Sequence, residues 1–180
     1  MSKPTVSVIG VGRVGSTVAF ALIPHCSRIT LMDSNENRLE GEFRDLRHSA
    51  WFINKDCVIE KGNIMDANRS DYAIICAGKP RKSSMESTDD LFDDNYPVVK
   101  AIWEKLNIKT LILTNPTERL AGTLNKEVFR KPMAVPVGGG LDKAREQIDG
   151  IKGGYIIDRK GHTNWGVAGE VVEFIRRKKY

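Results

Sequence analysis

The stretch Val6-Ser-Val-Ile-Gly10-Val-Gly12-Arg-Val-Gly15 places three glycines at fixed spacing directly after a short apolar run. Apolar residues then recur at helical spacing from Val14 to Leu22, which predicts a helix that begins within the glycine turn. A second apolar run, Ile29-Thr-Leu-Met32, ends at Asp33. Strand, glycine-rich turn, helix, strand and terminal acid therefore follow one another as they do in a dinucleotide-binding βαβ unit.

Each glycine in this turn has a mechanical role in holding a diphosphate. Gly10 permits a tight turn, Gly12 lets the backbone approach the phosphates, and Gly15 lets the helix pack close to the strand. The helix starts at Arg13 and Val14, and its N-terminus offers unpaired N–H groups and a positive dipole end to the phosphates.

Asp33 indicates which dinucleotide to expect. A carboxylate at this point accepts hydrogen bonds from a ribose 2′-hydroxyl, and its charge repels a 2′-phosphate. We therefore expect NAD as the cofactor rather than NADP. The alternative is a glycine-rich βα turn in some other doubly wound protein.

Strand and helix signals keep alternating along the chain at the spacing of βα units. Such alternation with right-handed crossovers predicts an α/β fold, a doubly wound parallel sheet in the Rossmann order 3-2-1-4-5-6 with a C-terminal helix. We expect residues 1–145 to form the NAD-binding domain, and residues 146–180 a short connection and a C-terminal helix packed on the same domain. The expected strands are about Thr5–Ile9, Arg28–Met32, Val58-Ile59, Tyr72–Cys76, Thr110–Leu113 and Met133–Val137. The expected helices are about Arg13–Ile23, from Asn35 onward, Thr88–Leu106, Glu118–Phe129 and Thr163–Arg177, while Ile151–Arg159 is open between a short helix and an edge strand at Tyr155–Ile157.

Ligands of such a sheet bind beyond the carboxyl ends of its strands. The glycine turn, Asp33, Ala77-Gly78, Asn115 and the Gly138–Gly140 turn all fall on that edge. Their shared location favours one binding site, with Ala77 and Gly78 among the cofactor-binding residues.

Composition narrows the partners and the compartment. The chain has 180 residues, 41% of them hydrophobic, and a mild net charge of +5 that lies largely in Arg176–Lys179 at a helix end, so we expect no nucleic-acid partner. Cys26, Cys57 and Cys76 match neither a metal site nor a disulfide framework. The sequence contains no recognisable secretion signal and no apolar run of membrane-spanning length, so we expect a cytoplasmic protein without a membrane partner.

Further motifs lie downstream, in the stretches Asp45-Leu-Arg-His-Ser49, Ala77-Gly-Lys-Pro-Arg-Lys82, Thr114-Asn-Pro116, Leu141-Asp-Lys-Ala-Arg145 and Lys160-Gly-His-Thr-Asn-Trp165. In this order they resemble the D-L-x-H-A, A-G-x-P-R-K, T-N-P, L-D-x-x-R and K-G-x-T-x-W motifs of the lactate/malate dehydrogenase family. The resemblance covers most of the chain. It implies an NAD-dependent oxidoreductase that acts on a small 2-hydroxy or 2-oxo acid.

The resemblance also implies roles for individual residues. Asn115 would contact the nicotinamide ribose or the substrate oxygen, and Arg145 would hold a substrate carboxylate in a bidentate fork. Asp142 would orient the catalytic histidine, Thr163 would line the nicotinamide pocket, and Arg81 would favour dicarboxylic substrates. From the residues alone, Asn115 is equally a strand-ending turn, and Asp142 with Arg145 an i,i+3 surface pair.

The departures from the family pattern concern catalysis. Family members carry a catalytic histidine in an H-G-[DE] context between the L-D-x-x-R and K-G-x-T motifs, whereas here only Glu146–Arg159 separates the two, without a histidine. Glu86-Ser87-Thr88 stands where the second substrate arginine is expected after Met85. We therefore expect the family's cofactor domain with its catalytic half excised, retained NAD binding, and weak or absent turnover.

Histidine occurs elsewhere at His25, His48 and His162. His25 follows the first helix and is expected at the surface, and His48 matches a structural helix position. His162 precedes the expected pocket residue Thr163, so the short connection could turn its imidazole toward the nicotinamide and make it catalytic. The alternative is a solvent-facing loop histidine.

Three functions remain open. The first is an NAD-binding dehydrogenase with weak or altered activity, favoured by Arg81, Asn115, Asp142 and Arg145. The second is a non-catalytic NAD(H)-binding or sensing module, and the third is a truncated or minimised cofactor domain. The missing histidine favours the last two.

We also expect a homodimer. In the family, the helix that carries D-L-x-H-A packs across a twofold axis near the late helix, and both elements are retained. Trp51, Phe52, Trp165 and Phe174 would supply aromatic surface for such a contact.

Overall fold

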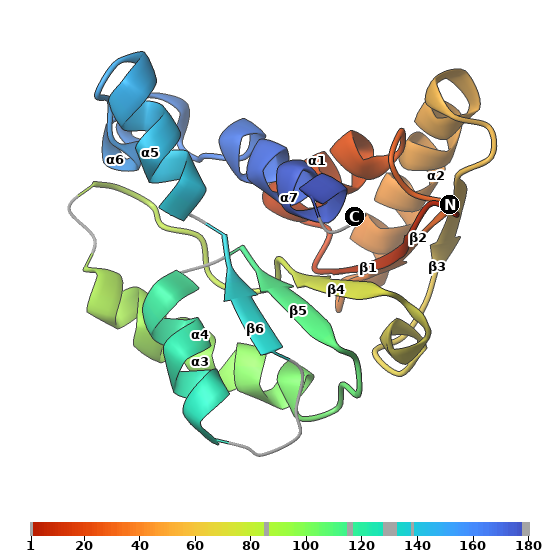
Figure 1. Ribbon diagram of the computed structural model, residues 1–180, viewed down its shortest axis with the longest axis horizontal. Coiled ribbons are helices and arrows are strands. Elements are labelled where there is room, and N and C mark those ends of the chain that lie inside the picture. The colour runs from red at the N-terminus through yellow and green to blue at the C-terminus, as the bar shows by residue number, and fades with distance from the viewer. Residues whose placement is uncertain (1, 85–86, 115–116, 128–132, 138, 178–180) are drawn as a thin grey trace.

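A parallel sheet forms the centre of the molecule. The computed structural model describes the chain except for residues 1, 85–86, 115–116, 128–132, 138 and 178–180. Within that part of the chain, six strands pair in the order β3-β2-β1-β4-β5-β6, every neighbour parallel, which confirms the predicted topology (Figure 1). The strands are β1 (Thr5–Ile9), β2 (Arg28–Met32), β3 (Val58–Lys61), β4 (Tyr72–Ile75), β5 (Thr110–Leu113) and β6 (Met133–Pro136).

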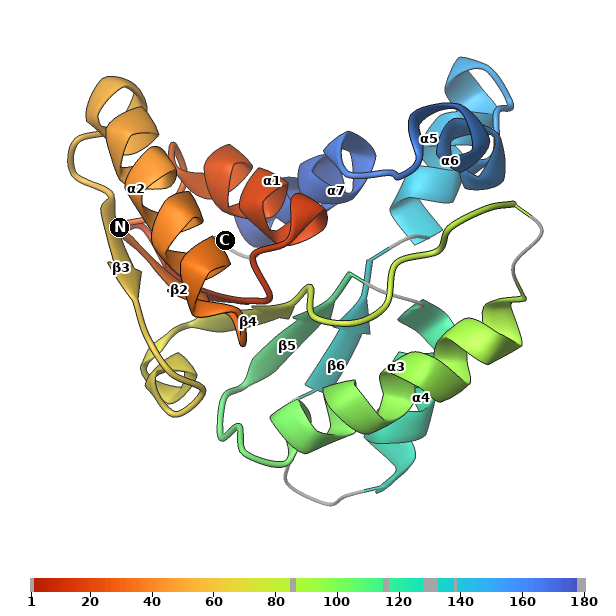
Figure 2. The same ribbon diagram turned by 180° about the vertical axis from the view of Figure 1, so that it is seen from behind.

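Helices cover both faces of this sheet. In the views of Figures 1 and 2, α1, α2 and α7 lie on one face and α3 and α4 on the other, while α5 and α6 stand together beyond the edge at β6. The helices are α1 (Arg13–Leu22), α2 (Glu36–Ile53), α3 (Thr88–Trp103), α4 (Thr117–Glu127), α5 (Gly139–Ile148), α6 (Gly153–Lys160) and α7 (Trp165–Arg177), with a 3₁₀ turn η1 at Asp66–Arg69.

The core consists of two apolar layers because successive strand residues point to opposite faces. Ile74 and Ile112 pack in the layer under α1 and α7, whereas Ile75 and Leu113 join the layer that contains Trp103 of α3. All five side chains are almost fully buried. Burial of each such side chain contributes roughly 1.5–3 kcal/mol, so the sheet is held from both sides.

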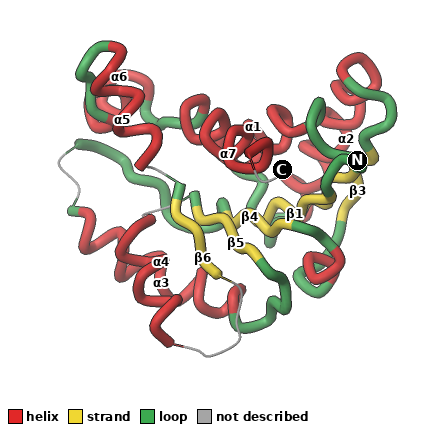
Figure 3. The backbone as a smooth tube through the Cα atoms, viewed as in Figure 1, coloured by secondary structure: helices red, strands yellow, loops and turns green. Residues whose placement is uncertain are grey.

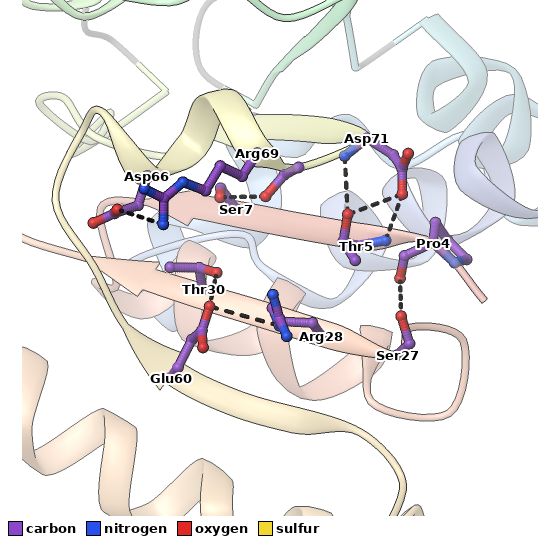
Figure 4. A network of polar contacts seen from close by, with 11 residues as sticks. Pro4, Thr5, Ser7, Ser27, Arg28, Thr30, Glu60, Asp66, Arg69 and Asp71 are labelled. Atoms are coloured by element: carbon purple, nitrogen blue, oxygen red, sulfur yellow. Dashed lines mark hydrogen bonds and ion pairs between the residues drawn. The ribbon is translucent and has the colours of Figure 1, made fainter. Parts of the chain in front are cut away.

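Polar side chains fasten neighbouring strands to one another (Figure 4). The Asp71 carboxylate accepts hydrogen bonds from the Thr5 amide at 2.8 Å and the Thr5 hydroxyl at 2.9 Å. On the next pair of strands, the Thr30 hydroxyl donates to Glu60 at 2.9 Å, and Arg28 lies 3.7 Å from the same carboxylate. These contacts link β1, β2 and β3 to their neighbours. The candidate site lies at the carboxyl edge of the same sheet.

The segment that the sequence left open is helical. Residues 151–159 lead into and form most of α6, so the edge strand at Tyr155–Ile157 does not form (Figure 3). At the next junction the buried side chain of Asn164 donates to the Thr17 hydroxyl of α1 at 2.8 Å, just before α7 begins. This bond joins α7 to α1, against which it packs.

Candidate dinucleotide-binding site

The glycine turn lies tightly against the end of β4. Gly10 has a φ of +91°, and a Cβ atom there would lie 2.5 Å from the Ala77 backbone nitrogen. A Cβ atom on Gly15 would lie 1.9 Å from the Gly10 carbonyl oxygen. Side chains are therefore excluded at both positions, and the backbone at the start of α1 is left exposed to the carboxyl edge of the sheet.

Asp33 is fastened to this turn. Its Oδ2 atom accepts a hydrogen bond from the Val11 amide at 2.9 Å, and its Oδ1 atom accepts one from the Asn35 amide at 2.8 Å. Only 7% of its side chain is exposed, and the Arg38 guanidinium of α2 lies 4.0 Å from Oδ2. The acid thus has a defined orientation at the end of β2, beside a cation that the sequence analysis did not single out.

A cavity of about 740 Å³ opens on this edge between the glycine turn, Asp33 and α3. Its volume falls within the usual range for small-molecule and cofactor sites. The glycine turn after β1 and Asp33 after β2, both predicted from the sequence as site residues, lie in its wall, and so do Ala77 and Gly78. The lining includes Gly10, Gly12, Met32, Asp33, Ser34, Glu36, Arg38, Gly62, Asn63, Ala77, Gly78, Ile102 and Lys105.

A second cavity of about 480 Å³ shares part of the wall of the first. Gly12, Arg38, Cys76 and Gly78 line both, so the two form neighbouring halves of one groove along the crest of the sheet. The second half brings together five residues that the sequence analysis proposed for the site from different motifs. These are Arg13, Val14, Arg81, His162 and Thr163, with Pro80, Thr114, Ile157, Gly161 and Val167 completing the lining.

His162 faces Arg13 within this second cavity. The Nη1 atom of Arg13 lies 3.3 Å from Nδ1 of the half-buried His162. Because a guanidinium group only donates, Nδ1 must be the acceptor, and the imidazole proton of the neutral ring is then on Nε2. The structure therefore brings His162 into the groove next to Thr163, although its Nδ1 atom already has a partner.

Arg81 borders the second cavity on the loop that follows β4. Its guanidinium donates to the Ser84 carbonyl at 2.8 Å, and the Ser84 amide in turn donates to the Asp158 carboxylate of α6 at 2.8 Å. Hydrogen bonds from Ser84 to Asp158 lower the pKa of that carboxyl group. The loop is thus tied to α6.

Asp142 and Arg145 lie elsewhere. Arg145 forms an i,i+3 ion pair with Asp142 at 2.8 Å on α5, and Asp142 is 72% exposed. The Arg145 guanidinium packs against Gly153 of α6, where an added Cβ atom would lie 3.1 Å from it. Neither residue belongs to the lining of the two cavities. Asn115 falls outside the described residues, and its neighbour Thr114 donates to the Ile75 carbonyl at 3.1 Å.

Two residues of the groove were not anticipated as site residues. Arg38 lies five positions after Asp33, in the first turns of a helix that the sequence predicts from Asn35 onward. Cys76 lines both halves, and burial raises the pKa of its thiol to about 12. A thiol with that pKa is almost entirely protonated near neutral pH, so it acts as wall rather than as a nucleophile.

Comparison with known proteins gives the family. The NAD binding domain model of lactate/malate dehydrogenase matches residues 4–135. The chain belongs to this family. The cofactor of the matched domain is NAD, as the glycine turn and Asp33 predicted, and the resemblance drawn from the motifs is confirmed.

Individual dehydrogenases are similar over much of the chain. L-lactate dehydrogenase 1 of Clostridium acetobutylicum is 36% identical over 154 residues, which cover 81% of this chain and 49% of that protein. Malate dehydrogenase of Staphylococcus saprophyticus subsp. saprophyticus is 32% identical over 157 residues, 82% of this chain and 50% of that protein. The chain thus spans about half the length of these curated relatives.

Solved structures agree on the fold of the lactate/malate dehydrogenase family. The malate dehydrogenase from Aeropyrum pernix superposes with a TM-score of 0.82 at 20% identity, covering 95% of this chain and 76% of that one. Across the described part of the chain, none of the helices is long and apolar enough to cross a membrane. The same residues contain no cluster of three or more His, Cys, Asp or Glu side chains arranged to hold a metal ion.

Proposed function

We propose that this chain binds NAD(H) along the groove and that its hydride transfer to a small 2-oxo acid, or from a 2-hydroxy acid, is weak or absent. The observation that carries the proposal is the environment of His162, the histidine of the second cavity, whose Nδ1 atom is engaged by Arg13. Residues 146–159, between the L-D-x-x-R and K-G-x-T motifs, contain no histidine and consist largely of helix.

The cofactor half of the proposal rests on geometry. Gly12 and the first residues of α1, Arg13 and Val14, line the groove, and a diphosphate that crosses the glycine turn would meet the free amides of this helix N-terminus. Asp33 would receive the adenosine ribose, and Thr163 would border the nicotinamide. NAD, when bound, supplies the hydride acceptor.

The acid–base half of the proposal concerns His162. In neutral His162 the hydrogen bond from Arg13 leaves the ring proton on Nε2, so the imidazole donates a hydrogen bond but holds no second proton to release. To act as a general acid it must first accept a proton at Nδ1 and give up Arg13. General acid–base catalysis contributes roughly 10²–10⁴-fold. We therefore expect turnover to be lower by about that factor than in a dehydrogenase that retains its catalytic histidine.

We also expect fewer substrate contacts than the family motifs imply. Arg81 borders the second cavity and is the proposed contact for a substrate carboxylate. Arg145 pairs with Asp142 and packs against Gly153, which supports the surface-pair alternative over carboxylate binding. A 2-oxo acid would therefore meet one of the expected arginines.

Binding and turnover are measured separately. We expect NADH fluorescence titration to give saturable binding, and NADH oxidation with oxaloacetate or pyruvate to remain below about 0.1 s⁻¹, given typical values of 1–10³ s⁻¹. His162→Ala is compared with the unmodified chain. Equal residual rates would end the catalytic role of His162, and turnover in the usual range would overturn the proposal of impaired catalysis. Failure to bind NADH would overturn the whole proposal.

A second candidate is a non-catalytic NAD(H)-sensing module. The bond between Ser84 and Asp158 favours it, because this bond ties the loop bordering the second cavity to α6, whose Ile157 also lines that cavity. A nucleotide that binds against the loop would then also stabilise α6. Slower backbone hydrogen exchange in α6 on adding NADH, without turnover, would support this function.

A further inference from the structure

Asp33 does not stand alone at the ribose end of the groove. The Arg38 guanidinium lies 4.0 Å from its Oδ2 atom, close enough for attraction but without a direct hydrogen bond between the two groups. About half of the Arg38 side chain, 47%, is exposed. A carboxylate at this position normally repels a 2′-phosphate, whereas a nearby arginine accommodates one. Both groups are present here.

The position of Arg38 points its donors into the groove. It lines both cavities, and its Nη1 atom lies 3.5 Å from where a Cβ atom on Gly12 would be. The amide of Arg38 donates to the cap residue Asn35 at 2.9 Å, which fixes the start of α2 and hence the base of the side chain. Ser34, with a hydroxyl group, lines the first cavity between Asp33 and this cap.

The local charges balance. Asp33 already accepts one backbone N–H on each oxygen and adds one negative charge, which Arg38 offsets with one positive charge. Glu36 lines the same cavity, and Lys105 provides a further cation in its lining. A 2′-phosphate beside Asp33 would therefore meet a planar donor group suited to phosphate rather than an unopposed carboxylate.

We propose that Arg38 gives the groove a second nucleotide specificity, by binding the adenosine 2′-phosphate of NADP(H) beside Asp33, so that the chain binds NADPH as well as NADH. The proposal rests on the dinucleotide groove of the proposed function and extends it to the choice of nucleotide. It departs from the expectation, drawn from Asp33 alone, that a 2′-phosphate is excluded.

The test compares the dissociation constants of NADPH and NADH by nicotinamide fluorescence in the unmodified chain and in Arg38→Gln. We expect the unmodified chain to bind NADPH within about tenfold of NADH, and the variant to weaken NADPH alone by about tenfold or more, as expected for a charge-assisted bond. Arg44→Gln is the matched control, because it removes the same charge from an exposed position of the same helix outside both cavities. It should leave the ratio of the two constants unchanged.

The outcomes separate this inference from the proposed function. Tight NADH binding without NADPH binding overturns the role of Arg38 and leaves the proposed function intact. Equal weakening of both nucleotides in Arg38→Gln also overturns it, because the arginine then contacts the diphosphate that both share. Binding of neither nucleotide by a folded chain removes both proposals. Loss of NADPH binding alone supports the inference, and Arg38→Lys, which keeps the charge without the fork, should then fall between the two.

Discussion

Gly15 illustrates how one absent side chain shapes the site. A Cβ atom there would lie 1.9 Å from the Gly10 carbonyl, so Gly15→Ala must push α1 away from the turn. We expect the free energy of unfolding to fall by about 3 kcal/mol, as for severe overpacking. Gly169→Ala on α7 is the control, since its added methyl group meets open space and should stabilise the helix by about 0.5–1 kcal/mol. Urea denaturation measures both, and equal effects would contradict the close packing at Gly15.

Two thiols with a raised pKa, buried Cys57 and half-buried Cys76 in the groove wall, make the stability of the chain depend on alkaline pH. Burial raises the pKa of Cys57 to about 11 and that of Cys76 to about 12, from an ordinary value of 9.0. Above pH 9 the unfolded chain loses these protons while the folded chain keeps them, so stability falls as the pH rises from 9 toward 11. We expect iodoacetamide at pH 8 to modify both cysteines in urea but not in the native protein, as read by mass spectrometry. Rapid native modification would contradict the raised pKa of these two thiols.

At the scale of elements, a single carboxylate holds α5 in place. Glu170 of α7 accepts hydrogen bonds from the amides of Gly140 at 3.0 Å and Leu141 at 3.2 Å, in the first turn of α5. Glu170→Ala should therefore destabilise the chain by about 1 kcal/mol, the usual effect of losing a helix cap. Glu173 lies one turn further along α7 and pairs with exposed Arg177, so Glu173→Ala should change stability by less than about 0.5 kcal/mol. Thermal unfolding measures the stability of both variants. An equal loss in the two would contradict the capping role of Glu170.

The contact between α6 and the loop after β4 depends on the ionised carboxylate of Asp158. Hydrogen bonds from Ser84 hold the pKa of the exposed Asp158 carboxyl below its ordinary value of 3.8, so the stabilisation is present above that pH and is lost on further acidification. We expect Asp158→Asn to speed hydrogen exchange of the Ser84 amide at pH 7. Asp56→Asn, at an exposed position on another part of the surface, serves as the control. Unchanged exchange at Ser84 would show that the bond does not hold the loop.

At the scale of the whole molecule, the end of α2 exposes apolar surface. Trp51 is 65% and Phe52 is 85% exposed, and Trp165 of α7 is 67% exposed. Phe174 does not belong to this surface, because it is half-buried and packs edge-on against Tyr72 at 6.3 Å. The homodimer remains our proposal, resting on the remaining aromatic side chains.

Light scattering at micromolar concentration tests the dimer. We expect a mass of twice the monomer for the unmodified chain, and a monomer for Trp51→Glu with Phe52→Glu, since two charges on this patch oppose its burial. Val58→Glu, at a half-exposed position at the start of β3, shows whether any exposed apolar residue has the same effect. A monomeric mass for the unmodified chain would remove the proposal.

Local signals were enough to predict the alternating strands and helices, the glycine turn and the strand-end position of Asp33, and the right-handed crossover rule then led to the sheet order. Strand and helix periodicity, glycine spacing and an acid at a strand end are all properties of neighbouring residues. The same signals left 151–159 undecided, since a short apolar run such as Tyr155–Ile157 is compatible with helix and strand alike.

Contacts between residues of different elements around the groove could be read from the folded chain alone. Arg13 and His162 are 149 positions apart, Ser84 and Asp158 are 74 apart, and each pair meets because α6 and α7 fold back beside α1 and the loop after β4. Arg145 likewise packs against Gly153 through the turn between α5 and α6. Contacts of this kind depend on how whole elements pack, for which no local pattern of residues provides a signal.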